Sequence, residues 1–152
     1  MSRKQDVTEK YIMLKGRKTE ELKYDEGYDK DRHVNEIKSA EWLKENFGGT
    51  IILLTEQPHH YEIKRADYLW DNKLWELKNT TSAKTVDSVL RKAIHQIMDN
   101  PGGVILDFGK NPIQLNSIES AIDTRIKKSC RFSMDIMIIA GGELKKVTRY
   151  TK

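Results

Sequence analysis

Two carboxylates and a lysine fall close together in a stretch that has the pattern of a β-hairpin. Asp67 is followed by Glu76 and Lys78, and the turn pair Asp71-Asn72 lies between them. A two-residue loop at that turn places Asp67 directly opposite Glu76, with Lys78 on the same face. Opposed carboxylates repel each other across a sheet, so this hairpin needs a cation between them, either Lys78 or a divalent metal.

This arrangement has the D-x8-E-x-K spacing of a metal-dependent phosphodiesterase. Asp67 and Glu76 are expected to give hard oxygen ligands to the metal, and the backbone carbonyl of Leu77 is expected to add another. Such a metal polarises the scissile phosphate and lowers the pKa of a bound water. Lys78 is expected to position or deprotonate that water and to offset charge in the transition state. The alternative is that Glu76 and Lys78 are ordinary surface residues of a hairpin.

A helix is predicted from Arg32 to Phe47, ending at Gly48-Gly49. Glu36 falls inside its apolar stripe at the helical period, and Glu41 falls at the edge. A glutamate that faces inward is costly unless it is paired or bound to a metal. Glu36 is therefore the third predicted carboxylate of the site, as a metal ligand or as the holder of a water, and Glu41 is the alternative. His33 is expected beside Glu36.

The remaining pattern predicts an α/β fold with a central mixed sheet flanked by helices. A helix between buried strands implies a crossover connection, and hence parallel strands beside the hairpin. The predicted order is helix, three strands, helix, strand, then a helix and a hairpin. The segments that carry this prediction after the first helix are 50–55, the hairpin around Asp71-Asn72, 86–98, 104–108, 116–126, 134–139 and 143–150.

Three polar side chains are candidates for contacts with nucleic acid. Lys92 and Gln96 are one turn apart on the polar side of the helix over 86–98, and Arg125 belongs to a basic C-terminal third. Solvated helix surface is the alternative for all three. Trp70 and Trp75 are interpreted as core residues rather than as platforms on which bases stack.

Composition limits the class of protein. The chain has 152 residues, a net charge of +4 and a pI near 9.0, which favours anionic partners. Its one cysteine, Cys130, excludes an internal disulfide and a cysteine-based zinc cluster. No long apolar run is present, so a soluble chain without an export signal or membrane segment is expected. Residues 1–31 are interpreted as a charged tail or linker, with one short strand possible at Tyr11–Leu14, and residues 32–152 as a nuclease domain.

These residues and their order resemble the PD-(D/E)XK nuclease superfamily. Within it, the chain is similar to the C-terminal tRNase domain of CdiA-type contact-dependent inhibition toxins, which is also found in phage and mobile-element proteins. The resemblance extends over about residues 32–150 and implies a catalytic set of Asp67, Glu76 and Lys78, with Glu36 from the first helix. Ala66 stands where the family motif usually has proline. The matching segments are Arg32-His33-Val34-Asn35-Glu36, Ala40, Leu43, Asp67-Tyr68-Leu69-Trp70, Leu74-Trp75-Glu76-Leu77-Lys78, Gln96-Ile97 and Gly102-Gly103-Val104-Ile105-Leu106.

The expected function is therefore a metal-dependent endonuclease, with a tRNA-like RNA placed ahead of DNA as its substrate. The alternatives are a DNA endonuclease of the same fold and a non-catalytic nucleic-acid-binding module. Mg²⁺ is the first choice of metal, and Mn²⁺ or Zn²⁺ are the others. An RNA enzyme of this kind could also use the 2′-hydroxyl as nucleophile with little dependence on metal. Expected partners are RNA or DNA and an immunity protein or larger parent polypeptide, in a bacterial or phage cytoplasm, and the sequence leaves the oligomeric state open.

Overall fold

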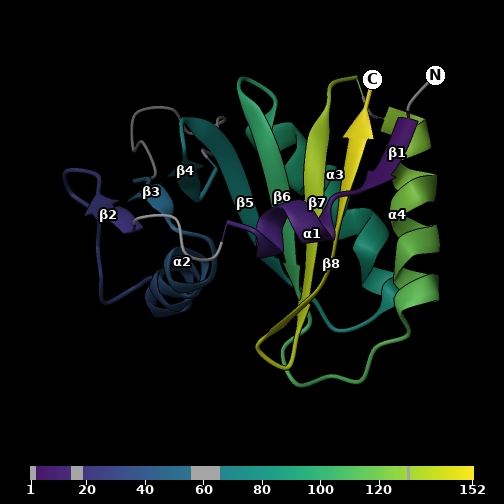
Figure 1. Ribbon diagram of the computed structural model, residues 1–152, viewed down its shortest axis with the longest axis horizontal. Helices are drawn as coiled ribbons and strands as arrows, with labels where there is room; N and C mark the ends of the chain where they lie inside the picture. Colours follow the sequence, from purple (N-terminus) through teal and green to yellow (C-terminus); the bar gives the residue numbers. More distant parts are fainter. Residues whose placement is uncertain (1–2, 15–18, 56–65, 130) are drawn as a thin grey trace.

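The computed structural model describes residues 3–14, 19–55, 66–129 and 131–152. Its elements form one eight-stranded sheet with helices on both faces (Figure 1). In the described residues, no helix is both long enough and apolar enough to cross a bilayer. The elements are β1 (Arg3–Asp6), α1 (Thr8–Ile12), β2 (Thr19–Tyr24), α2 (Val34–Phe47), β3 (Gly49–Leu53), β4 (Tyr68–Trp70), β5 (Lys73–Asn79), α3 (Ala83–Ile97), β6 (Pro101–Asp107), α4 (Leu115–Ser129), β7 (Met134–Ala140) and β8 (Glu143–Thr151).

The sheet is mixed, in the order β1-β8-β7-β6-β5-β4-β3-β2. Strands β5, β6 and β7 run parallel, because α3 and α4 cross over between them. The strands β3, β4 and β5 form an antiparallel meander, and β7 and β8 form an antiparallel hairpin. The predicted α/β class and the predicted element order from the first helix onward are thus confirmed.

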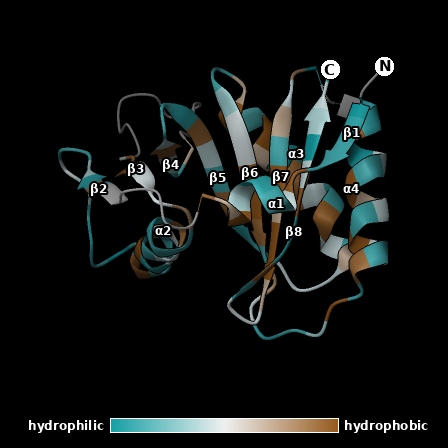
Figure 2. Cartoon of the chain, in the orientation of Figure 1, coloured by the Kyte–Doolittle hydropathy of each residue, from teal (hydrophilic) through white to brown (hydrophobic). Residues whose placement is uncertain are grey.

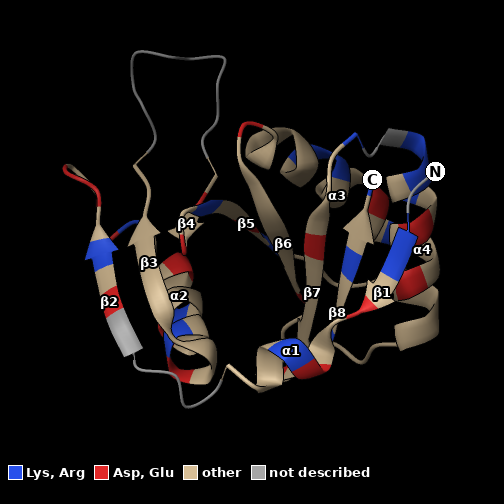
Figure 3. Ribbon diagram, turned by 45° about the horizontal axis from the view of Figure 1, so that its top comes forward, with Lys and Arg blue, Asp and Glu red and all other residues tan. Residues whose placement is uncertain are grey.

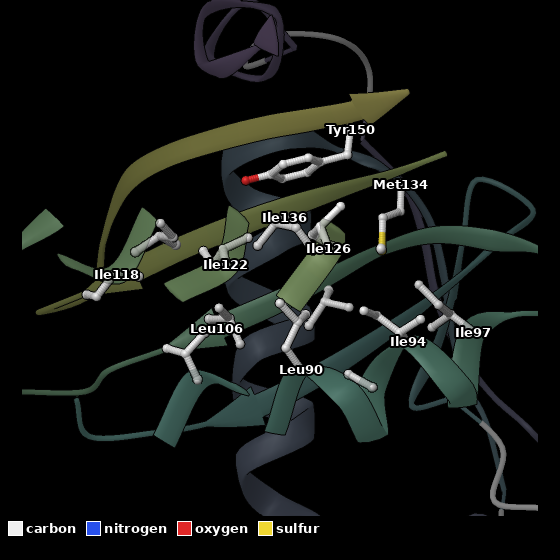
Figure 4. Packing of buried hydrophobic residues seen from close by; sticks show 14 of the residues in the cluster. Leu90, Ile94, Ile97, Leu106, Ile118, Ile122, Ile126, Met134, Ile136 and Tyr150 are labelled. Atoms are coloured by element: carbon white, nitrogen blue, oxygen red, sulfur yellow. The ribbon is translucent and has the colours of Figure 1, made fainter. Parts of the chain in front are cut away.

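Two apolar cores fill the spaces above and below the sheet. Side chains of α3 and α4 pack on one face, where Leu90, Ile122 and Ile126 lie against Leu106 and Ile136 (Figure 4). The other face packs against α1 and α2 and is rich in aromatic rings. In Figure 2, α4 carries both hydrophobic and hydrophilic residues, as expected for a helix with one face on the core.

The central hairpin has the predicted register. Tyr68 pairs with Trp75, Leu69 with Leu74, and Trp70 with Lys73. The turn residues Asp71 and Asn72 have φ values of 48° and 67°, the left-handed conformation that a two-residue turn of type I′ requires. Asp71 also fixes the neighbouring strand, because its Oδ1 accepts a hydrogen bond from the backbone N–H of Thr50 at 3.0 Å.

The N-terminal segment differs from the predicted tail. Strand β1 pairs with β8 at one edge of the sheet, and β2 pairs in parallel with β3 at the other edge. The predicted strand at Tyr11–Leu14 is wrong, because Thr8–Ile12 is helical and Tyr11 is buried. In this segment only single apolar residues are buried, by contacts with distant strands. Charged side chains are common on edge strands, so the sequence of this segment shows no hydrophobic periodicity that would predict its strands.

Candidate active site

Where β4 begins and β5 ends, the predicted catalytic residues line one open pocket of about 560 Å³, called here the acidic pocket. The first turn of α2 forms its other wall, and Figure 3 shows acidic residues on α2 and around β4. The residues of the pocket that matter for its chemistry are Arg32, His33, Glu36, Asp67, Glu76, Leu77, Lys78 and Gln96.

The side chains of Asp67 and Glu76 form hydrogen bonds with the backbone across the hairpin, just before β4 begins. The backbone N–H of Asp67 donates to Glu76 Oε1 at 3.0 Å, and the backbone N–H of Leu77 donates to Asp67 Oδ2 at 2.8 Å. The two side chains therefore point to the same side, as opposed residues of an antiparallel pair should. Glu76 is only 2% exposed, so a carboxylate is held inside the protein next to a second one.

Burial and the neighbouring acid change the protonation of Asp67. Burial, followed by the hydrogen bond with Glu76 and its negative charge, raises the pKa of Asp67 to about 8. Lys78 supplies the nearest cation, with its Nζ 3.2 Å from Glu76 Oε2 and its side chain 23% exposed to the pocket. One lysine thus faces two carboxyl groups, and the pocket can take up further positive charge when Asp67 loses its proton.

Glu36 reaches the same pocket from α2, as predicted, and Glu41 is exposed outside it. The Tyr28 hydroxyl donates to Glu36 Oε2 at 2.8 Å, and His33 Nδ1 lies 3.4 Å from Glu36 Oε1. Burial and the negative charge of Asp67 raise the pKa of Glu36. The predicted pairing of His33 with Glu36 is therefore present, and three carboxylates gather in one pocket.

The donor chemistry of the pocket fits a hard divalent cation. Asp67 and Glu76 offer carboxylate oxygens, and the Leu77 carbonyl points to the same side of β5 as the Leu77 N–H that bonds Asp67. Within the described residues, no three Asp, Glu, His or Cys side chains form a ready-made metal cage. Mg²⁺ does not need one, because it is commonly held by one or two carboxylates together with waters and substrate phosphate.

The three residues predicted to contact nucleic acid lie in different surroundings in the structure. Gln96 lines the acidic pocket, and its Oε1 is buried without a hydrogen-bond partner among the described atoms. Lys92 is exposed on α3 and is not part of the pocket wall. Arg125 instead ties α4 to α3, because its Nε and one terminal nitrogen each donate to Asp87 at 2.8 Å.

Comparison with known proteins gives the fold only. No protein-family model matches the chain, and no curated protein is similar to it in sequence. One chain of a solved structure, the "CdiA-CT/CdiI toxin and immunity complex from Burkholderia pseudomallei", superposes with a TM-score of 0.50 at 11% sequence identity. The match covers 82% of this chain and 97% of that one. The two chains share a fold. The predicted likeness to CdiA-type toxins is supported to that extent.

Sequence reasoning missed one residue of the site, Tyr28. Its hydroxyl holds Glu36, and its ring lies 5.2 Å from the imidazole of His33. Tyr28 falls in the segment that was interpreted as a tail, and no spacing relates it to the helix that follows. The backbone of Glu36 is fixed as well, since its carbonyl accepts a hydrogen bond from the Tyr68 hydroxyl at 2.6 Å.

Proposed function

We propose that this chain is a metal-dependent endonuclease of the PD-(D/E)XK type, which hydrolyses phosphodiester bonds of nucleic acid. One observation carries the proposal: the buried contact of Asp67 with Glu76, beside Lys78, at the wall of an open pocket. A purely structural hairpin gains nothing from two buried acids in contact, because burial disfavours their charged forms and one of them must keep a proton to avoid repulsion. Groups with strongly perturbed pKa values in a cleft are typical of catalytic sites.

Each residue has a role in this proposal. Asp67, Glu76 and the Leu77 carbonyl hold Mg²⁺, or Mn²⁺ or Zn²⁺ in its place, and the cation supplies Lewis-acid polarisation of the phosphate and a more acidic water. Lys78 positions the attacking water, accepts its proton when neutral, and offsets negative charge that builds on the phosphate. Glu36 orients a water from the opposite wall, or binds the cation directly.

The proposed substrate is nucleic acid, and the proposed protein partner is an immunity protein. RNA of the tRNA type is placed ahead of DNA because the motif resembles CdiA-type tRNase domains, and DNA of either form is the alternative. Gln96 is proposed to contact the substrate, since it lines the acidic pocket with an unpartnered oxygen. A role as a toxin domain, with an immunity protein as partner, is compatible with a structural neighbour that belongs to a toxin and immunity complex.

Cleavage of total tRNA and plasmid DNA, run side by side, tests the proposal. The purified full chain is expected to cut one of them with Mg²⁺, Mn²⁺ or Zn²⁺ and to stop when a chelator is added. Glu76→Gln and Lys78→Met, which keep the size of each side chain, are expected to abolish cleavage while the protein remains folded. Glu41→Gln and Lys84→Ala alter exposed residues outside the acidic pocket and serve as matched controls.

Different results identify the rivals. Cleavage of plasmid but not of tRNA indicates a DNA endonuclease of the same fold. Nucleic-acid binding that survives Glu76→Gln and Lys78→Met, without cleavage by the unmodified chain at any metal concentration, indicates a binding module. RNA cleavage that persists in chelator indicates attack by the 2′-hydroxyl and refutes the dependence on metal.

A further inference from the structure

A second pocket, of about 450 Å³, lies on the opposite face of the sheet from Glu76. Its walls come from α1, the turn between β4 and β5, and the first residues of β6 and β7. Figure 1 shows α1 lying across the sheet over β7 and β8, where it covers one side of this region. Trp75 lines the second pocket and Glu76 lines the acidic pocket, because adjacent strand residues point to opposite faces.

The indole N–H of Trp75 is unpaired in the described structure. The chain has three tryptophans, and the other two donate to backbone carbonyls: Trp42 Nε1 to Gly142 at 3.0 Å and Trp70 Nε1 to Gly48 at 3.1 Å. Trp75 is only 4% exposed as a whole residue, and no described residue accepts a hydrogen bond from its Nε1, although this nitrogen is not one of the fully buried polar atoms left without a partner. A donor at a pocket wall that no described residue uses is available to an acceptor on a ligand that displaces solvent.

Glycine keeps this donor accessible. A Cβ placed on Gly102 would lie 2.4 Å from Trp75 Nε1, and one placed on Gly103 would lie 2.6 Å from the far ring of the same indole. A side chain at Gly102 would cover the N–H or displace the indole, and one at Gly103 would collide with the Asp135 carbonyl and with the indole. The bare backbone at the start of β6 therefore shapes the wall at which the donor opens.

The rest of the pocket is aromatic with a cationic rim. The rings of Trp70 and Tyr11 lie 5.0 Å and 6.3 Å from that of Trp75, between centroids. Lys10 forms no ion pair with any described residue, and Lys73 Nζ donates only to the neutral Asn100 Oδ1, at 3.2 Å. A fitting ligand thus combines an apolar planar body, a hydrogen-bond acceptor on its edge and a negative charge.

The other charged groups of the pocket are Arg149, Asp135 and Asp71. Arg149 donates to both carboxylate oxygens of Asp135, at 2.8 and 3.0 Å, and the Tyr11 hydroxyl donates to the same acid at 2.5 Å. The Asp71 carboxylate accepts from the backbone of Thr50. The pocket lining thus holds three cations (Lys10, Lys73 and Arg149) against two carboxylates (Asp71 and Asp135), and this excess of positive charge favours an anionic ligand.

We propose that the second pocket binds a nucleotide, with an acceptor on the edge of the base bonded to Trp75 Nε1 and the phosphate between Lys10 and Lys73. The volume lies within the range of small-molecule sites, and an apolar wall with a few convergent polar groups is their usual form. The nucleotide is either free or part of a strand, since both present the same base and phosphate. This inference does not depend on nuclease activity, because it uses no residue of the acidic pocket.

The test follows the three indole N–H resonances of the isotope-labelled full chain by NMR, with chelator present so that nucleic acid stays intact. They are assigned through Trp42→Phe and Trp70→Phe. The four nucleoside monophosphates and a short single-stranded oligonucleotide are titrated in turn, with adenosine and inorganic phosphate as separate arms. A saturable shift of the Trp75 resonance with a mononucleotide or with the oligonucleotide is the expected result, and the tighter of the two identifies the source.

Variants make the result specific. Lys10→Ala and Lys73→Ala are each expected to weaken binding roughly two- to fivefold, the range of exposed charge pairs, and Lys145→Ala on the β7–β8 hairpin is expected to change nothing. Glu76→Gln is expected to leave this binding intact even where it abolishes cleavage, which separates the two proposals. The proposal is overturned if no nucleotide shifts Trp75 at millimolar concentration, if inorganic phosphate alone reproduces the shift, or if the lysine variants bind as tightly as the unmodified chain.

Discussion

Asp67→Asn is expected to change how the stability of the protein depends on pH. An unfolded aspartate has a pKa near 3.8, whereas burial and Glu76 raise the pKa of Asp67 to about 8 in the folded chain. Between these values the folded state holds a proton that the unfolded state has lost. The free energy of unfolding therefore falls as pH rises from about 4 to about 8, and it levels off above that.

The size of the effect follows from the same shift. One bound proton changes the free energy of unfolding by about 1.4 kcal/mol per pH unit, so an interval of about three units gives at most ~4 kcal/mol. Asparagine has the shape of aspartate but no proton to lose in this range. The variant is expected to recover roughly 2–4 kcal/mol of the stability that the unmodified chain loses between pH ~5 and pH ~8.

Urea unfolding in the presence of chelator measures this difference. The quantity to compare is the slope of the free energy of unfolding against pH. An altered hydrogen bond to Leu77 would shift this free energy by the same amount at every pH and leave the slope unchanged. Asp99→Asn, at an exposed position, is the control and is expected to keep the slope of the unmodified chain. Parallel curves for Asp67→Asn and the unmodified chain would falsify the claim that Asp67 is held protonated by burial and Glu76.

Three further outcomes are expected. Added Mg²⁺ should raise the unfolding midpoint of the unmodified chain more at pH 8 than at pH 5, because the cation competes with protons for the carboxylates. The midpoint of Asp67→Asn should not change with Mg²⁺, and an equal rise in both proteins would contradict a metal site at Asp67. Tyr28→Phe removes the hydroxyl that holds Glu36 and should lower the cleavage rate up to about tenfold while the protein still folds normally. An unchanged rate would show that cleavage does not depend on the orientation of Glu36 by Tyr28. Tyr11→Phe takes one donor from the buried Asp135 and should cost about 1–3 kcal/mol in the free energy of unfolding without changing cleavage; a change below about 0.5 kcal/mol would mean that water replaces the hydroxyl.

Local sequence patterns predicted the register of the central hairpin and the inward position of Glu36. The turn at Asp71-Asn72 sets the register of its hairpin, and strand alternation then brings Asp67 and Glu76 together. The inward position of Glu36 follows from the helical period of α2 in the same way. These rules act between neighbours, so a single sequence is enough to apply them.

The parts that it missed depend on contacts between distant segments. Tyr11 is buried because it meets Phe47, Trp70 and Trp75, and no pattern within residues 1–31 records those partners. Tyr28 reaches the acidic pocket only once β2 has docked beside β3. The open N–H of Trp75 is equally hidden in the sequence, because it depends on which glycines face the indole in the folded sheet.

The pairing of β1 with β8 has a consequence for the order of folding. Arg3–Asp6 belongs to the first strand of the described chain, and its partner is the last. Such contacts between residues far apart in sequence are slow to form, because a long loop must close before they give any stabilisation. During synthesis, the sheet between β2 and β7 can assemble while Arg3–Asp6 still lacks a partner. The edge that β1 covers is therefore expected to close last, when Glu143–Thr151 has left the ribosome.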